Sequence, residues 1–418
     1  MKGNLWPSRW AWMLCALMAT LGACTTSPDD GPAPSSISET DPSPPTAIAT
    51  VATQPLEPGP IMIKDGAYDP PDPLPGGRPG DVVAVDDAPA PEGASAWRML
   101  YRSTTLDGQP TAVSGWVAVP TTPGPHGIVV FAHGTTGLGD QCAPTLGGGA
   151  TPQQFAGLLA DGWTVAATDY QGLGTPGMHH YLVADAAARS VLDIARAAAV
   201  MDPAASLDGV ALVGFSQGGH AVLSAAERAG ELAPEIGLVG VVAAAPAMQL
   251  REWFAAAPSG QEGYLLMIAL AYADAYDVEA ADWLTSPALQ RRDEVEDACL
   301  MDARAVGSAL GRDAIATDAS PNTPIGNLLD ENEPGTTTLG MPVMIVTAGD
   351  DQLVTPDVAD DLITRMCAVD TDVTHHHIPT GSHGALSSLV REPARQWLGE
   401  QLAPSGAGPP DPCGGPWP

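Results

Sequence analysis

The feature that most constrains the fold is the pentapeptide Gly-Phe-Ser-Gln-Gly at residues 214–218. A short apolar run, 210–215, leads into it, and a stretch with helical spacing of apolar residues, 218–232, follows. Glycines around a serine between a strand and a helix permit the sharp, strained turn that exposes a nucleophilic hydroxyl. The bare pattern also occurs in ordinary serine-containing loops, but the strand–turn–helix context favours Ser216 as a nucleophile.

The surrounding chain predicts an α/β fold. Apolar runs of the length of buried parallel strands alternate with helical stretches, which indicates a mostly parallel sheet flanked by helices. An antiparallel pair, 96–103 and 111–119, precedes this core. The expected strands are residues 127–132, 164–169, 210–215, 238–245, 342–347 and 372–378, and the expected helices include 187–201, 218–232 and 358–368.

One segment interrupts the strand–helix alternation. Residues 248–340 contain apolar helical patches such as 264–273, then acidic turns and a return rich in Pro, Asn, Thr and Gly, with no clear strand. We interpret this segment as a helical cap inserted before the strand 342–347, with a separate domain as the alternative. The core would then comprise residues 61–247 and 341–418.

A serine needs a neighbouring base to accept its proton and an acid to orient that base. In hydrolases with this type of turn, the acid and then the base follow the serine along the chain. Gly-Asp-Asp at 349–351 follows the strand 342–347 and precedes a helix. The spacing from Asp351 to Val354 and Pro356 resembles that of related hydrolases and favours Asp351 as the acid, with Asp350 as the alternative.

The expected base is His383, which follows the last strand and opens the final helix. It comes 32 residues after Asp351, which leaves room for a helix and a strand. The histidine triplet at 375–377 competes by proximity, but it lies within the strand, where successive side chains point to opposite faces. That triplet has no Cys or carboxylate partner at ligand spacing, so no metal site is expected.

An oxyanion-binding loop is expected directly after the strand 127–132. His-Gly-Thr-Thr-Gly at 133–137 places a turn there, and the backbone N–H groups of Thr135 and Gln217 would be the two donors. We expect His133 to order this turn and not to act as the base.

Three other histidines and a glycine run stay outside the predicted site. His179 and His180 lie in a loop expected near it, and we interpret His220, on the helix after the serine, as a packing residue. The three glycines at 147–149 are not followed by Gly-Lys-Ser/Thr, so they do not indicate a phosphate-binding loop. No cofactor is expected.

The N-terminus resembles an export signal. Basic residues precede an apolar stretch, 10–21, that is too short to cross a bilayer. Leu-Gly-Ala-Cys at 21–24 resembles the lipobox of bacterial lipoproteins and predicts a signal peptide at 1–23 and a lipid on Cys24. A plain secretory signal is the alternative. We therefore expect an exported protein without a transmembrane helix, either secreted or attached to the membrane at the cell surface through its lipid.

Composition adds two limits. Sixteen of the 42 prolines fall in residues 25–95, beside only two basic residues. Such a stretch buries too little apolar surface to fold, so residues 24–60 are expected to form a tether, while the part from about Ile61 packs against the core. The whole chain has 17 Lys and Arg against 49 Asp and Glu, a net charge of −32, which argues against nucleic acid as a partner.

The cysteines agree with export. Two of the six lie in the signal region, up to Cys24, and an even remainder of four outside the cytosol predicts two disulfides. Three pairings are open, and four buried thiols are the alternative. We favour Cys142 with Cys299 and Cys367 with Cys413, because these bonds would fasten the insertion to the core and the C-terminal tail to a late helix.

With these residues in place, the chain from about residue 96 to 402 resembles the secretory lipase family of α/β-hydrolases. The resemblance implies the α/β-hydrolase fold with a helical cap, and ester hydrolysis carried by Ser216, Asp351 and His383. It rests on Val-Ser-Gly-Trp-Val-Ala-Val-Pro at 113–120, on 133–137 followed by Cys-Ala-Pro at 142–144, on Asp-Tyr-Gln-Gly-Leu-Gly at 169–174, and on 214–220.

Together these observations predict a serine esterase or lipase that hydrolyses carboxylic esters through an acyl-enzyme. Its partner would be an ester or lipid substrate, and the sequence does not distinguish triacylglycerols from shorter or polymeric esters. Two other classes stay open. One is a serine peptidase of the same fold, with Glu252 or Glu262 binding the amine of an aminoacyl amide, and the other is a non-catalytic cell-surface lipoprotein. The sequence gives no oligomeric state.

Overall fold

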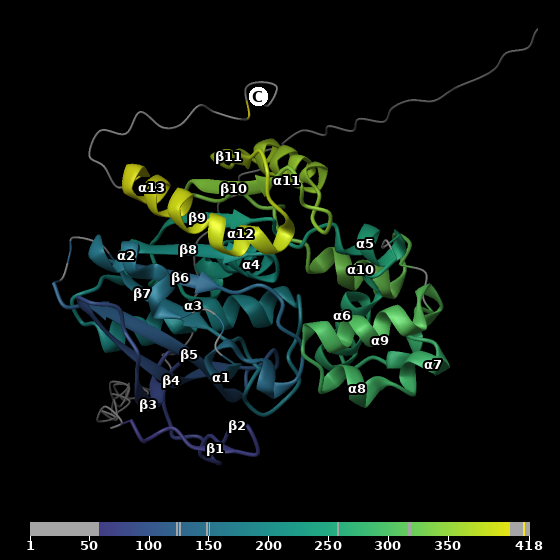
Figure 1. Cartoon of the computed structure of the whole chain (residues 1–418), viewed down its shortest axis with the longest axis horizontal. Helices are drawn as coiled ribbons and strands as arrows, with labels where there is room; N and C mark the ends of the chain where they lie inside the picture. The colour runs from purple at the N-terminus through teal and green to yellow at the C-terminus, as the bar shows by residue number, and fades with distance from the viewer. Residues whose placement is uncertain are drawn as a thin grey trace, which may run out of the picture. The chain divides into compact units, whose positions relative to one another are not determined.

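A nine-stranded sheet forms the centre of the computed structural model (Figure 1). Its strands are β3 (Val82–Ala88), β4 (Ala94–Thr104), β5 (Pro110–Pro120), β6 (Ile128–Ala132), β7 (Thr164–Thr168), β8 (Val210–Phe215), β9 (Leu238–Ala244), β10 (Val343–Ala348) and β11 (Val373–Ile378). The order across the sheet is β11-β10-β9-β8-β6-β7-β5-β4-β3. Strands β6 to β11 are parallel to one another, and β5, β4 and β3 add an antiparallel end. The predicted α/β class and mostly parallel sheet are thus confirmed.

The structure describes residues 58–122, 124, 127–147, 149, 151–256, 259–316, 319–401 and 413. The chain divides into two units, Met1–Ala52 and Thr53–Pro418, and every described residue belongs to the second. The predicted signal peptide, the lipid site at Cys24 and almost all of the predicted tether lie outside the described residues. Across the described part, no helix is both long and apolar enough to span a membrane.

Helices cover both faces of the sheet because its strands alternate apolar side chains between the two faces. Val130, Leu212 and Val241 face one layer, whereas Val129 and Val213 face the other. The first layer contains α3 (Ala184–Met201), α4 (Gln217–Leu232) and α11 (Pro356–Ala368), and the second contains α2 (Ala156–Ala160), α12 (His383–Leu389) and α13 (Arg391–Gln401).

The predicted cap is a group of helices between β9 and β10, set beside the sheet in Figure 1. Helix α6 lies at its centre and is buried almost all around, which explains why its apolar residues are not confined to one face. The cap helices are α5 (Leu250–Ala256), α6 (Glu262–Ala275), α7 (Ser286–Leu289), α8 (Arg292–Glu296), α9 (Leu300–Leu310) and α10 (Pro324–Glu331).

Glu333 holds the two ends of the cap together. Its carboxylate accepts the backbone N–H groups of Gln249 (2.8 Å) and Leu250 (3.2 Å), where the cap begins, although Glu333 itself lies just after the last cap helix. Arg365 of α11 donates to the same carboxylate at 2.9 Å. Both connections between cap and core therefore meet at one side chain that is only 10% exposed.

The N-terminal part of the fold differs from expectation. Strand β3 at the sheet edge was not predicted, because it lies inside a stretch whose composition is that of a spacer. Backbone pairing begins even earlier: Gly59 N–H donates to Val83 O at 3.1 Å, and Val85 N–H donates to Gly59 O at 2.9 Å. A small ribbon of β1 (Ile63–Lys64) and β2 (Ala67–Tyr68) follows. The described part of the chain thus includes residues assigned to the tether.

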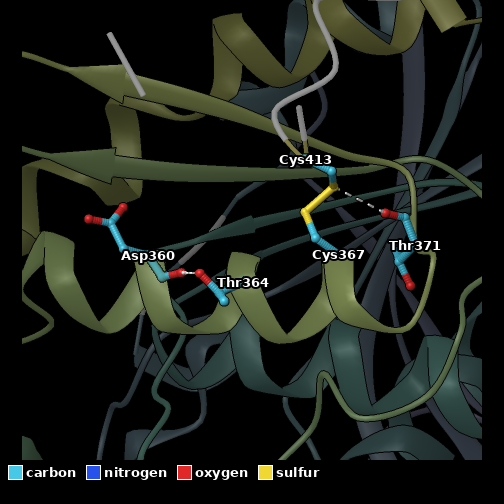
Figure 2. The surroundings of a disulfide bond; sticks show 5 residues. All are labelled: Asp360, Thr364, Cys367, Thr371 and Cys413. Carbon is cyan, nitrogen blue, oxygen red and sulfur yellow. Dashed lines mark hydrogen bonds between the residues drawn. A yellow bond between two sulfur atoms is a disulfide. The ribbon is translucent and has the colours of Figure 1, made fainter. Parts of the chain in front are cut away.

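Two disulfides have the predicted pairing. Cys142 is bonded to Cys299, and Cys367 at the end of α11 is bonded to Cys413. Figure 2 shows the second bond, with the Cys413 sulfur directed toward the carbonyl of Thr371 at 3.9 Å. This bond fastens residue 413 to the end of α11.

We expect Glu333→Ala to lower the free energy of unfolding by about 3 kcal/mol, because it leaves the Arg365 guanidinium and two backbone N–H groups without their acceptor in a mostly buried site. Urea-induced unfolding measures this change. The matched control is Glu331→Ala, at an exposed position two residues earlier, with an expected change within about 0.5 kcal/mol. Equal losses in both variants would contradict the role assigned to Glu333.

Candidate active site

Ser216 lies in a sharp turn between β8 and α4. Its backbone has φ 55° and ψ −116°, a conformation that costs energy for a residue with a side chain. The flanking glycines permit the turn: a Cβ on Gly218 would stand 1.8 Å from the carbonyl oxygen of Ala132, and one on Gly214 would stand 2.0 Å from that of Gly218. The predicted strand–turn–helix geometry is therefore present, and it presents the serine hydroxyl at the carboxyl end of the sheet.

The structure brings Ser216, His383 and Asp351 together in one chain of hydrogen bonds. His383 Nε2 lies 2.9 Å from Ser216 Oγ, and His383 Nδ1 lies 2.8 Å from Asp351 Oδ2. With Nδ1 protonated and donating to the carboxylate, Nε2 is free to accept the serine proton. The imidazole ring also packs on Phe215, with the ring centroids 4.9 Å apart, which limits its rotation.

The two neighbouring aspartates have different environments. Asp351 is 1% exposed, and its Oδ1 accepts the N–H groups of Leu353 and Val354 at 2.9 Å each, which leaves Oδ2 for His383. Asp350 is exposed and accepts the N–H of Gly381 at 2.9 Å. Asp351 therefore contacts the histidine, whereas Asp350 holds the loop that carries it.

The loop after β6 lies against the cap. Leu300 N–H donates to Thr136 O at 2.7 Å, and Leu138 N–H donates to Ala298 O at 3.0 Å, so the cap backbone pairs with the predicted oxyanion loop. The Cys142–Cys299 bond reinforces this pairing. The backbone of one cap segment thus fixes the loop that carries the expected donor at Thr135.

A cavity of about 480 Å³ opens over the serine. Ser216, His383 and Thr135 line it from the core, and Tyr264 and Leu300 line it from the cap. Gln217, the other expected oxyanion donor, is the first residue of α4, so its N–H has no acceptor within the helix. The cap residues of this cavity were not named from the sequence, because helical periodicity shows which residues are apolar but not which cavity a polar one faces.

Three histidines behind this site are buried. Burial lowers the pKa of His179 to about 3 and the pKa values of His133 and His220 to about 4. His133 contacts the carbonyl of Gly134 (2.7 Å) in its own loop, and His220 contacts the carbonyl of Asn332 (2.7 Å) at the end of the cap. His133 thus contacts its own turn, which we expected it to order, whereas His220, interpreted as a packing residue, also holds a backbone carbonyl of the cap.

The histidine triplet on β11 is also held within the fold. His375 Nε2 and His377 Nδ1 both lie 2.9 Å from Thr347 Oγ1 on the neighbouring strand. Among the residues that the structure describes, no three His, Cys, Asp or Glu side chains converge as metal ligands would.

A mostly parallel sheet with a serine turn after one of its strands, followed along the chain by a helical cap, defines an α/β-hydrolase. The family model for secretory lipases matches residues 145–408, more than half of the chain, and the protein belongs to the secretory lipase family. This confirms the resemblance seen in the sequence. The family description also agrees with export.

Known relatives cover most of the chain. A Mycobacterium tuberculosis protein named a probable inactive lipase is 25% identical over 356 residues, 78% of either chain. Candida antarctica lipase A has a TM-score of 0.64 and 19% identity, covering 75% of this chain and 80% of its own. The rice cell wall degrading esterase LipA of Xanthomonas oryzae has a TM-score of 0.64 and 17% identity, covering 77% and 96%. The two structures show the shared fold.

We expect the double variant Cys142→Ser/Cys299→Ser to loosen the oxyanion loop. Without the bond, amide hydrogen exchange should rise in residues 133–138 and 298–300, and the free energy of unfolding should fall by about 2–4 kcal/mol. Mass-spectrometric hydrogen exchange measures the first effect. Cys367→Ser/Cys413→Ser is the control that loses stability while exchange in 133–138 stays unchanged. Equal exchange with and without the Cys142–Cys299 bond would contradict this link.

A pH dependence of stability follows from the buried His220. Its folded pKa of about 4 lies below the ordinary 6.5, so the unfolded chain binds a proton first as the pH falls. Stability is therefore lost between pH 6.5 and 4, by up to about 1.4 kcal/mol per pH unit for this group. His220→Gln keeps a donor for Asn332 and removes the titration. Urea unfolding across this range should give a shallower slope for the variant, and parallel curves would refute the assignment.

Proposed function

We propose that the protein is a serine esterase that hydrolyses carboxylic esters through an acyl-enzyme on Ser216. The observation that carries this proposal is the continuous chain of hydrogen bonds from Ser216 through His383 to Asp351, at the floor of a cavity large enough for a substrate. Esters or lipids are the proposed partners. Attachment to a membrane through a lipid on Cys24 stays a prediction.

The proposed reaction has two halves. His383 Nε2 accepts the proton of Ser216 while Oγ bonds to the ester carbonyl carbon, and Asp351 stabilises the resulting imidazolium. The carbonyl oxygen gains negative charge, for which the N–H groups of Thr135 and Gln217 are the proposed donors. The C–O bond to the alcohol then breaks, with the proton returned from His383. Water, deprotonated by the same histidine, then bonds to the acyl carbon, the C–Oγ bond breaks, and His383 returns the proton to Ser216 Oγ as the acid leaves.

The relative named a probable inactive lipase calls for a comparison with this chain. An inactive member of a hydrolase family commonly lacks one of the groups that the chemistry needs. Here a serine, a histidine and a buried aspartate are all present, and His383 lies within 3 Å of both Ser216 Oγ and Asp351 Oδ2. This arrangement supports catalysis, and it argues against the non-catalytic lipoprotein.

The peptidase alternative is less well supported. It needs an acidic side chain free to bind the amine of an aminoacyl amide. Glu252 forms an ion pair with Arg251 at 2.6 Å, and the carboxylate of Glu262 accepts the N–H of Gly260 at 2.8 Å. Both acids are thus already engaged, which favours esters.

We expect purified protein to hydrolyse p-nitrophenyl esters, and Ser216→Ala to lower kcat by at least about 10³-fold while the fold is retained. Asp351→Asn should lower kcat by roughly 10⁴-fold, because an amide orients the wrong tautomer of His383. Asp350→Asn is the matched control, with an expected loss below about tenfold, since Asp350 does not contact the histidine. Graded acyl lengths separate esterase from lipase behaviour.

Two outcomes would count against the proposal. If wild-type protein is inert toward every ester tested, the esterase function is wrong, and aminoacyl amides become the next substrates to test. If Asp350→Asn is the more damaging of the two aspartate variants, the acid has been assigned to the wrong residue.

A further inference from the structure

The cavity over Ser216 is lined by an arginine for which the described residues provide no acidic partner. Arg304, on the cap helix α9, lines this cavity together with Ser216 and His383. Within the described part of the chain, Arg304 forms no hydrogen bond or ion pair, and its Nε is buried without an acceptor. Its guanidinium carbon lies 5.9 Å from the centre of the Tyr264 ring. The face of the Tyr264 ring attracts the positive charge of Arg304, and the guanidinium N–H groups stay free to donate to a ligand.

An unpaired arginine is unexpected in this protein. The chain has 49 acidic residues against 17 basic ones, so acidic partners are abundant. Many other arginines of the described chain are in ion pairs, for example Arg251 with Asp330, Arg291 with Glu294 and Arg365 with Glu333. Among the described residues Arg391 also lacks an ion pair and has a buried Nε without an acceptor, but it packs on Phe155 and does not line this cavity. Arg304 differs in its position, because it lines the cavity that contains the proposed nucleophile, where a ligand can supply an anion.

The fold fixes the position of Arg304. Helices α6 and α9 touch backbone to backbone, since a Cβ on Gly263 would stand 2.6 Å from the Cα of Arg304, and one on Gly307 would stand 2.2 Å from the nitrogen of Gly263. Just before α9, Cys299 is bonded to Cys142 of the core. The guanidinium is thus mounted on a helix that is tied at one end to the oxyanion loop.

The other titratable groups that line the cavity are Asp350 and His383. Asp350 is exposed to water and accepts the N–H of Gly381, so its charge is screened and partly neutralised by that bond. Most of the remaining lining side chains from the cap and the loops around it are polar, including Ser259, Gln261 and Gln352. Phe215, Leu300 and Leu353 add apolar side chains, so the cavity combines an apolar wall with polar groups and one arginine.

We propose that Arg304 binds an anionic group of the substrate, so that the preferred substrates are esters that also carry a carboxylate in their acyl or alcohol part. This inference rests on the esterase function proposed above. Arginine pairs with a carboxylate through two parallel N–H···O bonds, which gives orientation as well as affinity. Arg304 would hold the carboxylate end of the substrate while the ester carbonyl lies at Ser216.

The test compares esters that differ only in charge. For the acyl side, mono-p-nitrophenyl adipate is compared with its methyl ester, and for the alcohol side, 4-butyryloxybenzoate is compared with its methyl ester. The measured quantity is the ratio of kcat/KM for the charged ester over the neutral one. We expect wild type to favour one charged ester, and Arg304→Met to lower that ratio by roughly 10- to 100-fold, as expected for loss of a hydrogen-bonded ion pair.

Three further variants make the result specific. Arg304→Lys keeps the charge and should retain part of the preference, whereas Arg304→Glu should reverse it. Arg291→Met removes the same charge from a partly exposed cap position outside the cavity and should leave the ratio unchanged, so it controls for the field of the whole protein. Asp350→Asn should raise the ratio. Circular dichroism and thermal unfolding verify that each variant folds.

The outcomes separate the two proposals. If neutral and charged esters are both inert, the esterase function itself fails. If neutral esters turn over but neither charged ester is favoured, or if Arg304→Met and Arg291→Met change the ratio equally, the esterase function stands and the assignment of Arg304 is overturned. A preference confined to one half of the substrate shows on which side of the scissile bond the anion lies.

Discussion

The structure depends on one close backbone contact, between the turn that carries Ser216 and the end of β6. Ala132 O comes so near to Gly218 that only a residue without a side chain fits, and this contact forces the chain to reverse sharply after β8. The strain of a serine at positive φ is held by the buried strands on both sides. From this turn, α4 runs back along the sheet, and the hydroxyl projects toward the loops that carry His383 and Asp351.

The cap completes the site by rigid attachment to the core. It is joined to the core at its two chain ends through Glu333, and again through the backbone pairing of residues 298–300 with the loop after β6. Residues 298–300 lead directly into α9, which carries Arg304. The same pairing therefore positions both this cavity-lining helix and the loop after β6. Among the described residues, the cap is thus attached to the core both at its two chain ends and at the loop that leads from β6.

Much of this could be predicted from the sequence, and the limits have physical causes. Ser216, Asp351 and His383 follow strand ends, where local pattern and chain order carry the signal. The edge strand β3 was missed because proline and acidic residues around it dominate the composition, although pairing with one neighbour suffices for an edge strand. Arg304 and Glu333 were missed for a different reason. Glu333 is distinguished by partners far away in the chain, and Arg304 by having no such partner among the described residues. A local sequence pattern contains neither kind of information.

The Cys142–Cys299 bond has a consequence for where the protein matures. It links residues 157 positions apart, so both must be synthesised and brought together before the two sulfurs can meet. In a reducing compartment the two thiols stay reduced even when they are close in space. The Cys142–Cys299 bond therefore forms only in an oxidising environment. Protein retained in the cytosol would lack this bond. The structure around Ser216 therefore depends on the compartment as well as on the sequence.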